Sequence, residues 1–112
     1  MDYVLLAYGS LDGPPGAIDA AIAALLERPS VTGWARLYGD ESATTLRSDD
    51  AKTLLTDGPF IDSKEFLGGL ILVEAGNLDG ALAIAAELAE LRPARVVAIE
   101  VRPVRGEETR GA

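Results

Sequence analysis

Residues 3–8 read YVLLAY, and every position of this run is apolar or β-prone. A strand with one face in water alternates apolar and polar side chains, whereas a strand covered on both faces does not. The run therefore predicts a central strand of a sheet. Residues 67–75, which read LGGLILVEA, are again apolar on both faces and predict another main strand.

Two helices are predicted where apolar residues recur at helical spacing, at residues 18–26 and 78–89. Asn77 suits the N-cap of the second helix, because its side chain can accept a hydrogen bond from the backbone of the first turn. An Arg-Pro pair follows each segment, with the prolines at Pro29 and Pro93. Each helix is expected to end there, because the residue before a proline is disfavoured in the α region.

Two further strands are predicted at residues 31–38 and 96–102, whose side chains alternate in character. Residues 43–47 and 52–56 are short β-like runs joined by a polar turn, and they predict an inserted hairpin. The order of elements corresponds to two βαβ halves with a split connection. We therefore predict an α+β fold: ferredoxin-like βαββαβ with an inserted hairpin, an antiparallel sheet and two helices on one face.

A chain of 112 residues falls in the range of one domain, which we place at residues 1–104, with a polar C-terminal tail at 105–112. Two helices can cover only one face of the predicted sheet. Alternation counted from Val31 places Trp34 on the other, open face, together with apolar residues of the central strands. Apolar surface of that extent is normally hidden by a partner, so a homodimer joined through the open face is predicted.

The composition excludes several classes of function. Eighteen acidic residues against ten basic ones give a net charge of −8, which disfavours direct binding to nucleic acid. The chain has neither Cys nor His, which excludes thiolate chemistry and Cys-zinc sites and removes the commonest general base. It also lacks glycine loops of P-loop or Rossmann spacing and the acidic ladder of a calcium loop. No metal and no cofactor are predicted.

The sequence favours a cytoplasmic location. Its apolar runs are far shorter than the roughly 18 to 20 residues that a membrane-spanning helix requires. The first residues, Met1 to Tyr3, lack the basic region and the small-residue cleavage site of a signal peptide. We therefore expect neither a membrane segment nor export.

Five short blocks of sequence occur along the chain in a recognisable order and spacing. They are ATTLR at 43–47, TDGPF at 56–60, KE at 64–65, LGG at 67–69 and EVRPV at 100–104. Together they resemble the signature of the DGPF branch of the YCII-related family, over nearly the whole chain. The resemblance implies a dimeric α/β barrel whose function is largely unassigned.

The resemblance also implies two kinds of activity. Relatives occur beside, or fused to, sigma factors of the extracytoplasmic-function type. Some wider YCII-like proteins are thought to be enzymes that use an Asp and a His. This chain departs from that pattern, because it has no His to supply.

Asp57 has two interpretations. Between Thr56 and the Gly58-Pro59 pair, its carboxylate could be desolvated in a dimer cleft, where a raised pKa would make it a usable acid or base. Alternatively, its oxygens accept backbone N–H groups and hold the turn, as Asp before Gly commonly does. The residues leave both interpretations open.

The remaining candidate ligand-binding residues are charged. Arg47 and Lys64 could hold a ligand carboxylate, Arg47 through a bidentate fork, or they could be ordinary surface residues. Glu100 and Arg102 lie two apart on one strand and share a face, where they could line a cleft or pair with cross-strand neighbours. The spacing of Asp62 and Glu65 is close to that of a capping box and predicts the start of a short helix.

Three functions remain in competition at the level of sequence. The leading hypothesis is a small dimeric binding or regulatory module, linked by resemblance to sigma-factor signalling and holding a small-molecule acid. The alternative is an enzyme that acts on a small organic acid, with Asp57 moving a proton and Arg47 or Lys64 holding the substrate's charge. The third is a purely structural dimer.

Overall fold

The computed structural model describes residues 1–10, 18–61, 64–91, 93 and 95–106. Its elements in chain order are β1 (Asp2–Ser10), α1 (Ala20–Leu26), β2 (Val31–Arg36), η1 (Asp40–Ser42), β3 (Thr44–Asp49), β4 (Lys52–Asp57), β5 (Glu65–Glu74), α2 (Leu78–Glu90) and β6 (Val96–Pro103). The predicted order of elements, including the inserted hairpin, is confirmed. Most of the predicted C-terminal tail lies outside the described residues.

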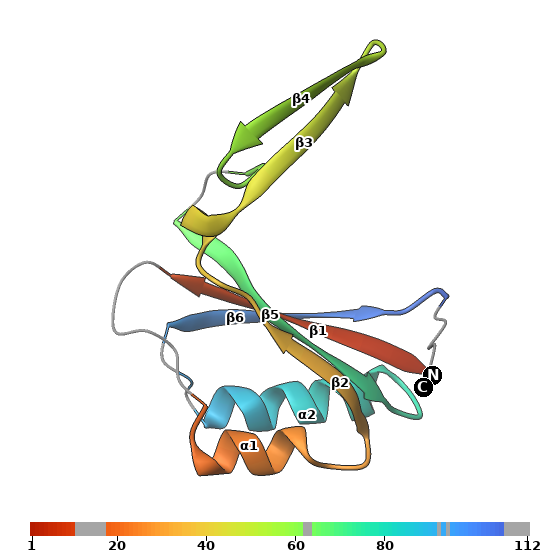
Figure 1. Ribbon diagram of the computed structural model, residues 1–112. Helices are drawn as coiled ribbons and strands as arrows, with labels where there is room; N and C mark the ends of the chain where they lie inside the picture. The colour runs from red at the N-terminus through yellow and green to blue at the C-terminus, as the bar shows by residue number, and fades with distance from the viewer. Residues whose placement is uncertain (11–17, 62–63, 92, 94, 107–112) are drawn as a thin grey trace, which may run out of the picture.

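The four main strands form one antiparallel sheet in the order β2-β5-β1-β6. The two strands with the most apolar sequences, β1 and β5, occupy its centre, as their patterns predict. Both helices lie on the same face of this sheet (Figure 1). This strand order and this one-sided helix layer are those of the α+β ferredoxin-like fold, so the predicted fold class is confirmed.

Polar side chains define where both helices begin. The Asp19 carboxylate accepts a 2.9 Å hydrogen bond from the backbone N–H of Ile22 at the start of α1. Asn77 caps α2 as predicted, since its side-chain oxygen accepts a 3.0 Å hydrogen bond from the N–H of Gly80. α1 stops ahead of Pro29, also as predicted.

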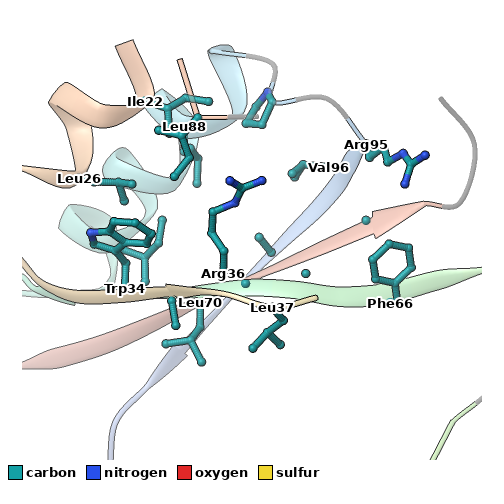
Figure 2. A pocket seen from close by; sticks show the side chains of 18 of the residues that line it. Ile22, Leu26, Trp34, Arg36, Leu37, Phe66, Leu70, Leu88, Arg95 and Val96 are labelled. Atoms are coloured by element: carbon teal, nitrogen blue, oxygen red, sulfur yellow. The ribbon is translucent and has the colours of Figure 1, made fainter. Parts of the chain in front are cut away.

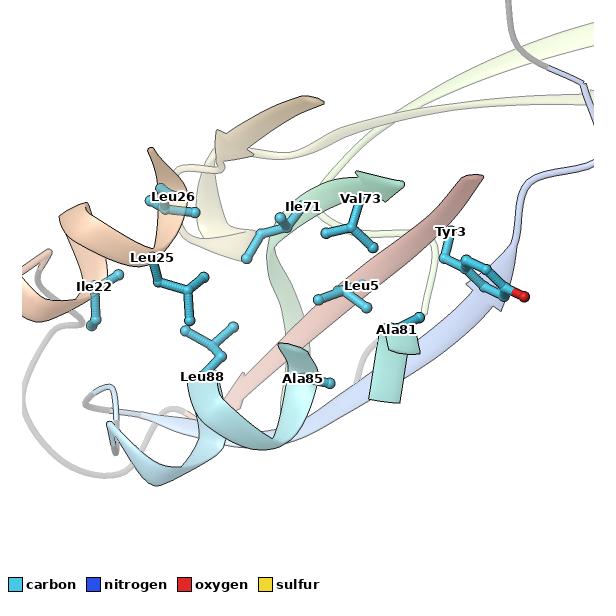
Figure 3. Close-up of a cluster of buried hydrophobic side chains, with 10 residues drawn as sticks. All are labelled: Tyr3, Leu5, Ile22, Leu25, Leu26, Ile71, Val73, Ala81, Ala85 and Leu88. Atoms are coloured by element: carbon cyan, nitrogen blue, oxygen red, sulfur yellow. The ribbon is translucent and has the colours of Figure 1, made fainter. Parts of the chain in front are cut away.

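The hydrophobic core lies between the sheet and the two helices (Figure 3). Its buried side chains are Tyr3 and Leu5 of β1, Ile22, Leu25 and Leu26 of α1, Ile71 and Val73 of β5, and Ala81, Ala85 and Leu88 of α2. Leu5 and Val73 are fully buried. Since Leu5 pairs with Ile71 across the strands, all core residues of β1 and β5 share the helix-covered face.

The opposite face of the sheet carries the alternate residues of the same strands. Val4 pairs with Leu72 there, and Leu6 pairs with Leu70. All four side chains are only partly buried, because neither helix covers this face. The expected apolar open face is therefore present.

One predicted side-chain position is wrong. Val31 pairs with Val73, but Gly33 pairs with Leu72, so the register between β2 and β5 shifts at Thr32. A shift of one residue turns every later side chain to the other face. Trp34 consequently lies opposite Ile71 on the helix-covered face, and not on the open face where strict alternation placed it.

β3 and β4 pair with each other and form a separate two-stranded sheet. Asp50 and Ala51 form their turn with φ values of 40° and 69°, the left-handed conformation that two-residue hairpin turns require. This hairpin extends away from the helices (Figure 1). Along it, Leu46, Leu54 and Leu55 are all exposed.

Glu65 corrects a second expectation. It begins β5 and pairs with Ser10 of β1, so it does not belong to the first turn of a helix. Pairing with a central strand supplies the backbone hydrogen bonds that a cap would otherwise provide. Asp62, the other half of the predicted capping box, lies outside the described residues.

Candidate functional site

A pocket of about 360 Å³ lies between the helices and the part of the sheet formed by β2, β5 and the end of β1 (Figure 2). Its volume is in the range of small-molecule sites in proteins. The residues that shape it come from every layer of the fold: Ala7 and Gly9 of β1, Ile22 and Leu26 of α1, Trp34 and Arg36 of β2, Phe66 and Gly69 of β5, Leu88 of α2, and Arg95 and Val96 around the start of β6.

Small residues on the helix-covered face create this space. Ala7 pairs with Gly69, which in turn pairs with Arg36 on the neighbouring strand. A Cβ atom on Gly69 would lie 2.9 Å from the carbonyl oxygen of Ala35, so the position has no room for a side chain. The floor of the pocket at Gly69 is therefore backbone.

The walls of the pocket are mainly apolar. Ile22, Leu26 and Leu88 come from the two helices, and Val96 closes the side next to β6. Trp34 faces the same space and is 48% exposed, which is a large apolar surface to leave in water. Walls of this kind favour a ligand with an apolar body.

Two arginines supply the charge of the pocket. Figure 2 shows Arg36 rising from β2 into the space between Leu88 and Val96, while Arg95 lies beyond Val96. Both residues also take part in a further interaction within the protein. No Asp or Glu occurs among the described residues that line the pocket, although the chain as a whole has a net charge of −8. The described lining of the pocket thus carries basic but no acidic side chains.

Two of the sequence-predicted site residues lie on the hairpin. The guanidinium carbon of Arg47 is 5.3 Å from the centre of the Phe60 ring, a cation–π contact. Asp57 ends β4 opposite Thr44 and is exposed. No backbone N–H within the described part of the chain donates a hydrogen bond to its carboxylate. Gly58 follows with φ 104°, a backbone conformation that favours glycine.

The other three predicted residues are also exposed. Lys64 directly precedes β5. Glu100 and Arg102 lie opposite Leu6 and Val4, which places both on the open face of the sheet. The Glu100 carboxylate accepts a 3.3 Å hydrogen bond from the Tyr8 hydroxyl. None of the five predicted site residues lines the pocket.

Comparison with known proteins gives the family. The model of the YCII-related domain matches residues 1–105. The chain belongs to the YCII-related domain family. The family prediction made from the five sequence blocks is thereby confirmed, while the assignment to its DGPF branch stays a prediction.

A curated relative of this YCII-related protein is an uncharacterized protein of Rhizobium meliloti (strain 1021). The two are 40% identical over 70 residues, which cover 62% of this chain and 56% of the relative. The aligned region thus spans little more than half of that protein's length. The relative's name assigns no activity.

The described residues include no group of three or more acidic side chains that could hold a metal ion. Their helices, α1 and α2 among them, are all too short or too polar to cross a membrane.

Arg36 and Arg95 are the functional candidates that the sequence did not single out in this YCII-related protein. A partial signal for Arg36 was present, because Trp34 and Arg36 are two apart on one strand and so share a face. For Arg95 no signal existed. Its φ of 70° and the 2.9 Å hydrogen bond from the Ser10 N–H to its carbonyl belong to a connection that forms only in the folded chain.

Proposed function

We propose that this YCII-related protein binds a small organic molecule in the pocket between the helices and the sheet. The observation that supports it most strongly is the joint presence of a bare backbone floor at Gly69 and a half-exposed Trp34 beside it. An apolar side chain left this exposed gains free energy when a ligand removes it from water. Binding is thus the expected use of this space.

Filling the floor of the pocket tests this proposal. Ala7→Leu places an isobutyl group on the helix-covered face, over Gly69, and should abolish ligand binding while the fold is retained. The measurement is the melting temperature with naphthoate, phenylacetate, octanoate, and the amide and amine analogue of each. A compound present at about 100 times its Kd stabilises the protein by roughly 2.7 kcal/mol.

Ala24→Leu is the matched control, because Ala24 is exposed on α1 and does not line the pocket. We expect at least one compound to raise the melting temperature of the wild type and of Ala24→Leu, and none to raise that of Ala7→Leu. Equal shifts in Ala7→Leu would place binding elsewhere. Circular dichroism establishes that both variants are folded.

The same proposal includes a homodimer. Its support is that one chain leaves two apolar surfaces uncovered: the open sheet face around Leu6 and Leu72, and the hairpin with Leu46 and Leu55. A two-stranded hairpin is at best marginally stable in water by itself, so it gains from packing against another surface. A second copy related by two-fold symmetry would cover the open sheet face and the hairpin of both chains at once, since both copies contribute the same two surfaces to the interface.

A regulatory role linked to an extracytoplasmic-function sigma factor, and a cytoplasmic location, complete the proposal. The sigma-factor link rests on the resemblance of the five sequence blocks to the DGPF branch. In this scheme the pocket senses a small molecule, and its occupancy alters the stability of the dimer or its contacts. The chain's net charge of −8 makes a protein partner more suitable than nucleic acid.

The enzyme hypothesis requires a desolvated Asp57, with Arg47 or Lys64 near the substrate's charge. These residues are exposed within one chain, so a second chain would have to bury the Asp57 carboxylate. Because Asp57 is exposed and no described backbone N–H donates to its carboxylate, we expect Asp57→Asn and Asp57→Ala each to change the free energy of unfolding by less than about 0.5 kcal/mol. Paired urea titrations measure this.

A different result would revive the enzyme hypothesis. If the dimer buries Asp57 as a charged group, Asp57→Asn should raise the stability, because it removes a desolvated charge, and any turnover should be lost. If Asp57→Ala alone is destabilised, the side chain accepts hydrogen bonds that hold the turn. Small, equal changes in both variants would exclude either role.

A further inference from the structure

We propose that the pocket is selective for an organic acid with one negative charge and a flat apolar body, whose carboxylate is bound by Arg36 while its body lies along Trp34. This inference rests on the proposed function, because it names the ligand class of the same pocket. It assigns the recognition of the acid to Arg36, and not to Arg47 or Lys64.

The charge distribution determines the sign of the ligand. Among the described residues, the pocket is lined by two basic side chains, Arg36 and Arg95, and by no acidic one. A cationic ligand would be repelled there. A neutral apolar ligand would displace water from a guanidinium and supply no charge in its place. An anion is the ligand class that gains from both arginines.

The position of Arg36 permits a specific contact. Its cross-strand neighbour is Gly69, so the methylene groups of Arg36 lie beside backbone and its guanidinium extends further into the pocket (Figure 2). A guanidinium carries five N–H donors in a planar fork. A carboxylate uses two of them in the bidentate geometry, which leaves three for the interaction that Arg36 already makes within the protein.

Trp34 determines the shape of the ligand's body. It is two residues before Arg36 on the same face of β2, so the ring and the guanidinium address neighbouring parts of one ligand. Flat rings pack on an indole face with a large contact area. An inorganic anion could bind Arg36 but would leave the apolar walls of the pocket in contact with water. A nucleotide with several negative charges would be repelled by the net charge of −8 of the protein.

The single tryptophan of the chain is Trp34, so intrinsic fluorescence reports directly on the pocket. The experiment titrates naphthoate, phenylacetate and octanoate, each against its primary amide, into the wild type, Arg36→Gln and Arg28→Gln. Arg28 is the matched control: it forms a surface ion pair with Glu87 and lies outside the pocket, so its replacement removes the same charge elsewhere. Ring compounds absorb light and can lower the Trp34 fluorescence without binding. Displacement of a bound ring acid by octanoate, which has no ring, therefore separates binding from this absorbance.

We expect the wild type and Arg28→Gln to prefer the ring acids over their amides by on the order of 10- to 100-fold in Kd, the range of a hydrogen bond to a charged group. Arg36→Gln should lose most of this preference, because only the more distant charge of Arg95 remains, and its affinity for the amide should be unchanged. Tighter binding of naphthoate than of octanoate would support the flat body.

Three outcomes would overturn the inference. Arg36→Gln could retain the preference for the acid, the wild type could bind acid and amide equally, or no acid of the panel could bind. In the last two cases, amides or amines that still bind the wild type and not Ala7→Leu would leave the proposed function standing. If no compound of any class bound, the proposed function would fail as well.

Discussion

Replacing Leu72 by aspartate is expected to convert the proposed homodimer to a monomer. Leu72 lies on the open face, opposite Val4 and Gly33. In a two-fold dimer, Leu72→Asp would bury two unpaired carboxylates, one from each chain, and each carboxylate would cost several kcal/mol. Sedimentation at micromolar concentration measures the change from twice the 11.7 kDa chain mass to the mass of one chain.

Leu78→Asp is the control for this prediction. Leu78 begins α2 and is 47% exposed, on the layer that the dimer would leave in water. An acidic residue in the first turn of a helix is favourable, so this variant should stay dimeric. A wild-type protein that is monomeric at this concentration would refute the dimer. A dimeric Leu72→Asp would shift the interface from the sheet face to the hairpin.

Leu5→Ala is expected to lower the free energy of unfolding by about 2–5 kcal/mol. The Leu5 side chain is fully buried in the core between the sheet and the helices. Its removal leaves a cavity and also loses the transfer free energy of the side chain. Leu6 is the adjacent residue on the opposite face of the same strand and is only partly buried within one chain. Chemical denaturation of the two variants compares the faces directly.

The dependence on protein concentration separates the two effects. The loss in Leu5→Ala should be the same at all concentrations, because the cavity lies inside one chain. The loss in Leu6→Ala should shrink as the protein is diluted, since a dimer contact contributes to stability by mass action and is lost from wild type and variant alike when the dimer dissociates. Equal losses, both independent of concentration, would indicate that Leu6 packs within its own chain.

Local chemistry was sufficient to predict most of the fold. The apolar run at residues 3–8 identifies a central strand because it has no polar face to give to water. Asn77 and Pro29 mark helix boundaries through the hydrogen bonds that they accept or cannot donate. These signals act within a few residues, so the sequence alone contains them.

Pairing between distant segments explains where prediction failed. The shift at Thr32 depends on how β2 meets β5, and it alone moves Trp34 from one face to the other. The spacing of Glu65 from Asp62 fits a helix cap, yet Glu65 pairs with Ser10 in the β1–β5 ladder and is therefore part of a strand. The two-residue spacing of Trp34 and Arg36 places them on one face of a strand, whereas Arg95 joins them in the pocket only when β6 pairs with β1.

Within the described part of the chain, β3 and β4 pair only with each other, so each leaves one edge of the hairpin without a strand partner. Each edge presents backbone N–H and C=O groups to which a strand of another molecule could add, which is the first step toward a fibre. Charged side chains along the hairpin, at Arg47, Asp49, Lys52 and Asp57, oppose such addition because a flat, uncharged edge is what strand growth requires. Two of these charges, Arg47 and Asp57, are also site residues predicted from the sequence, so the same side chains oppose polymerisation through the hairpin.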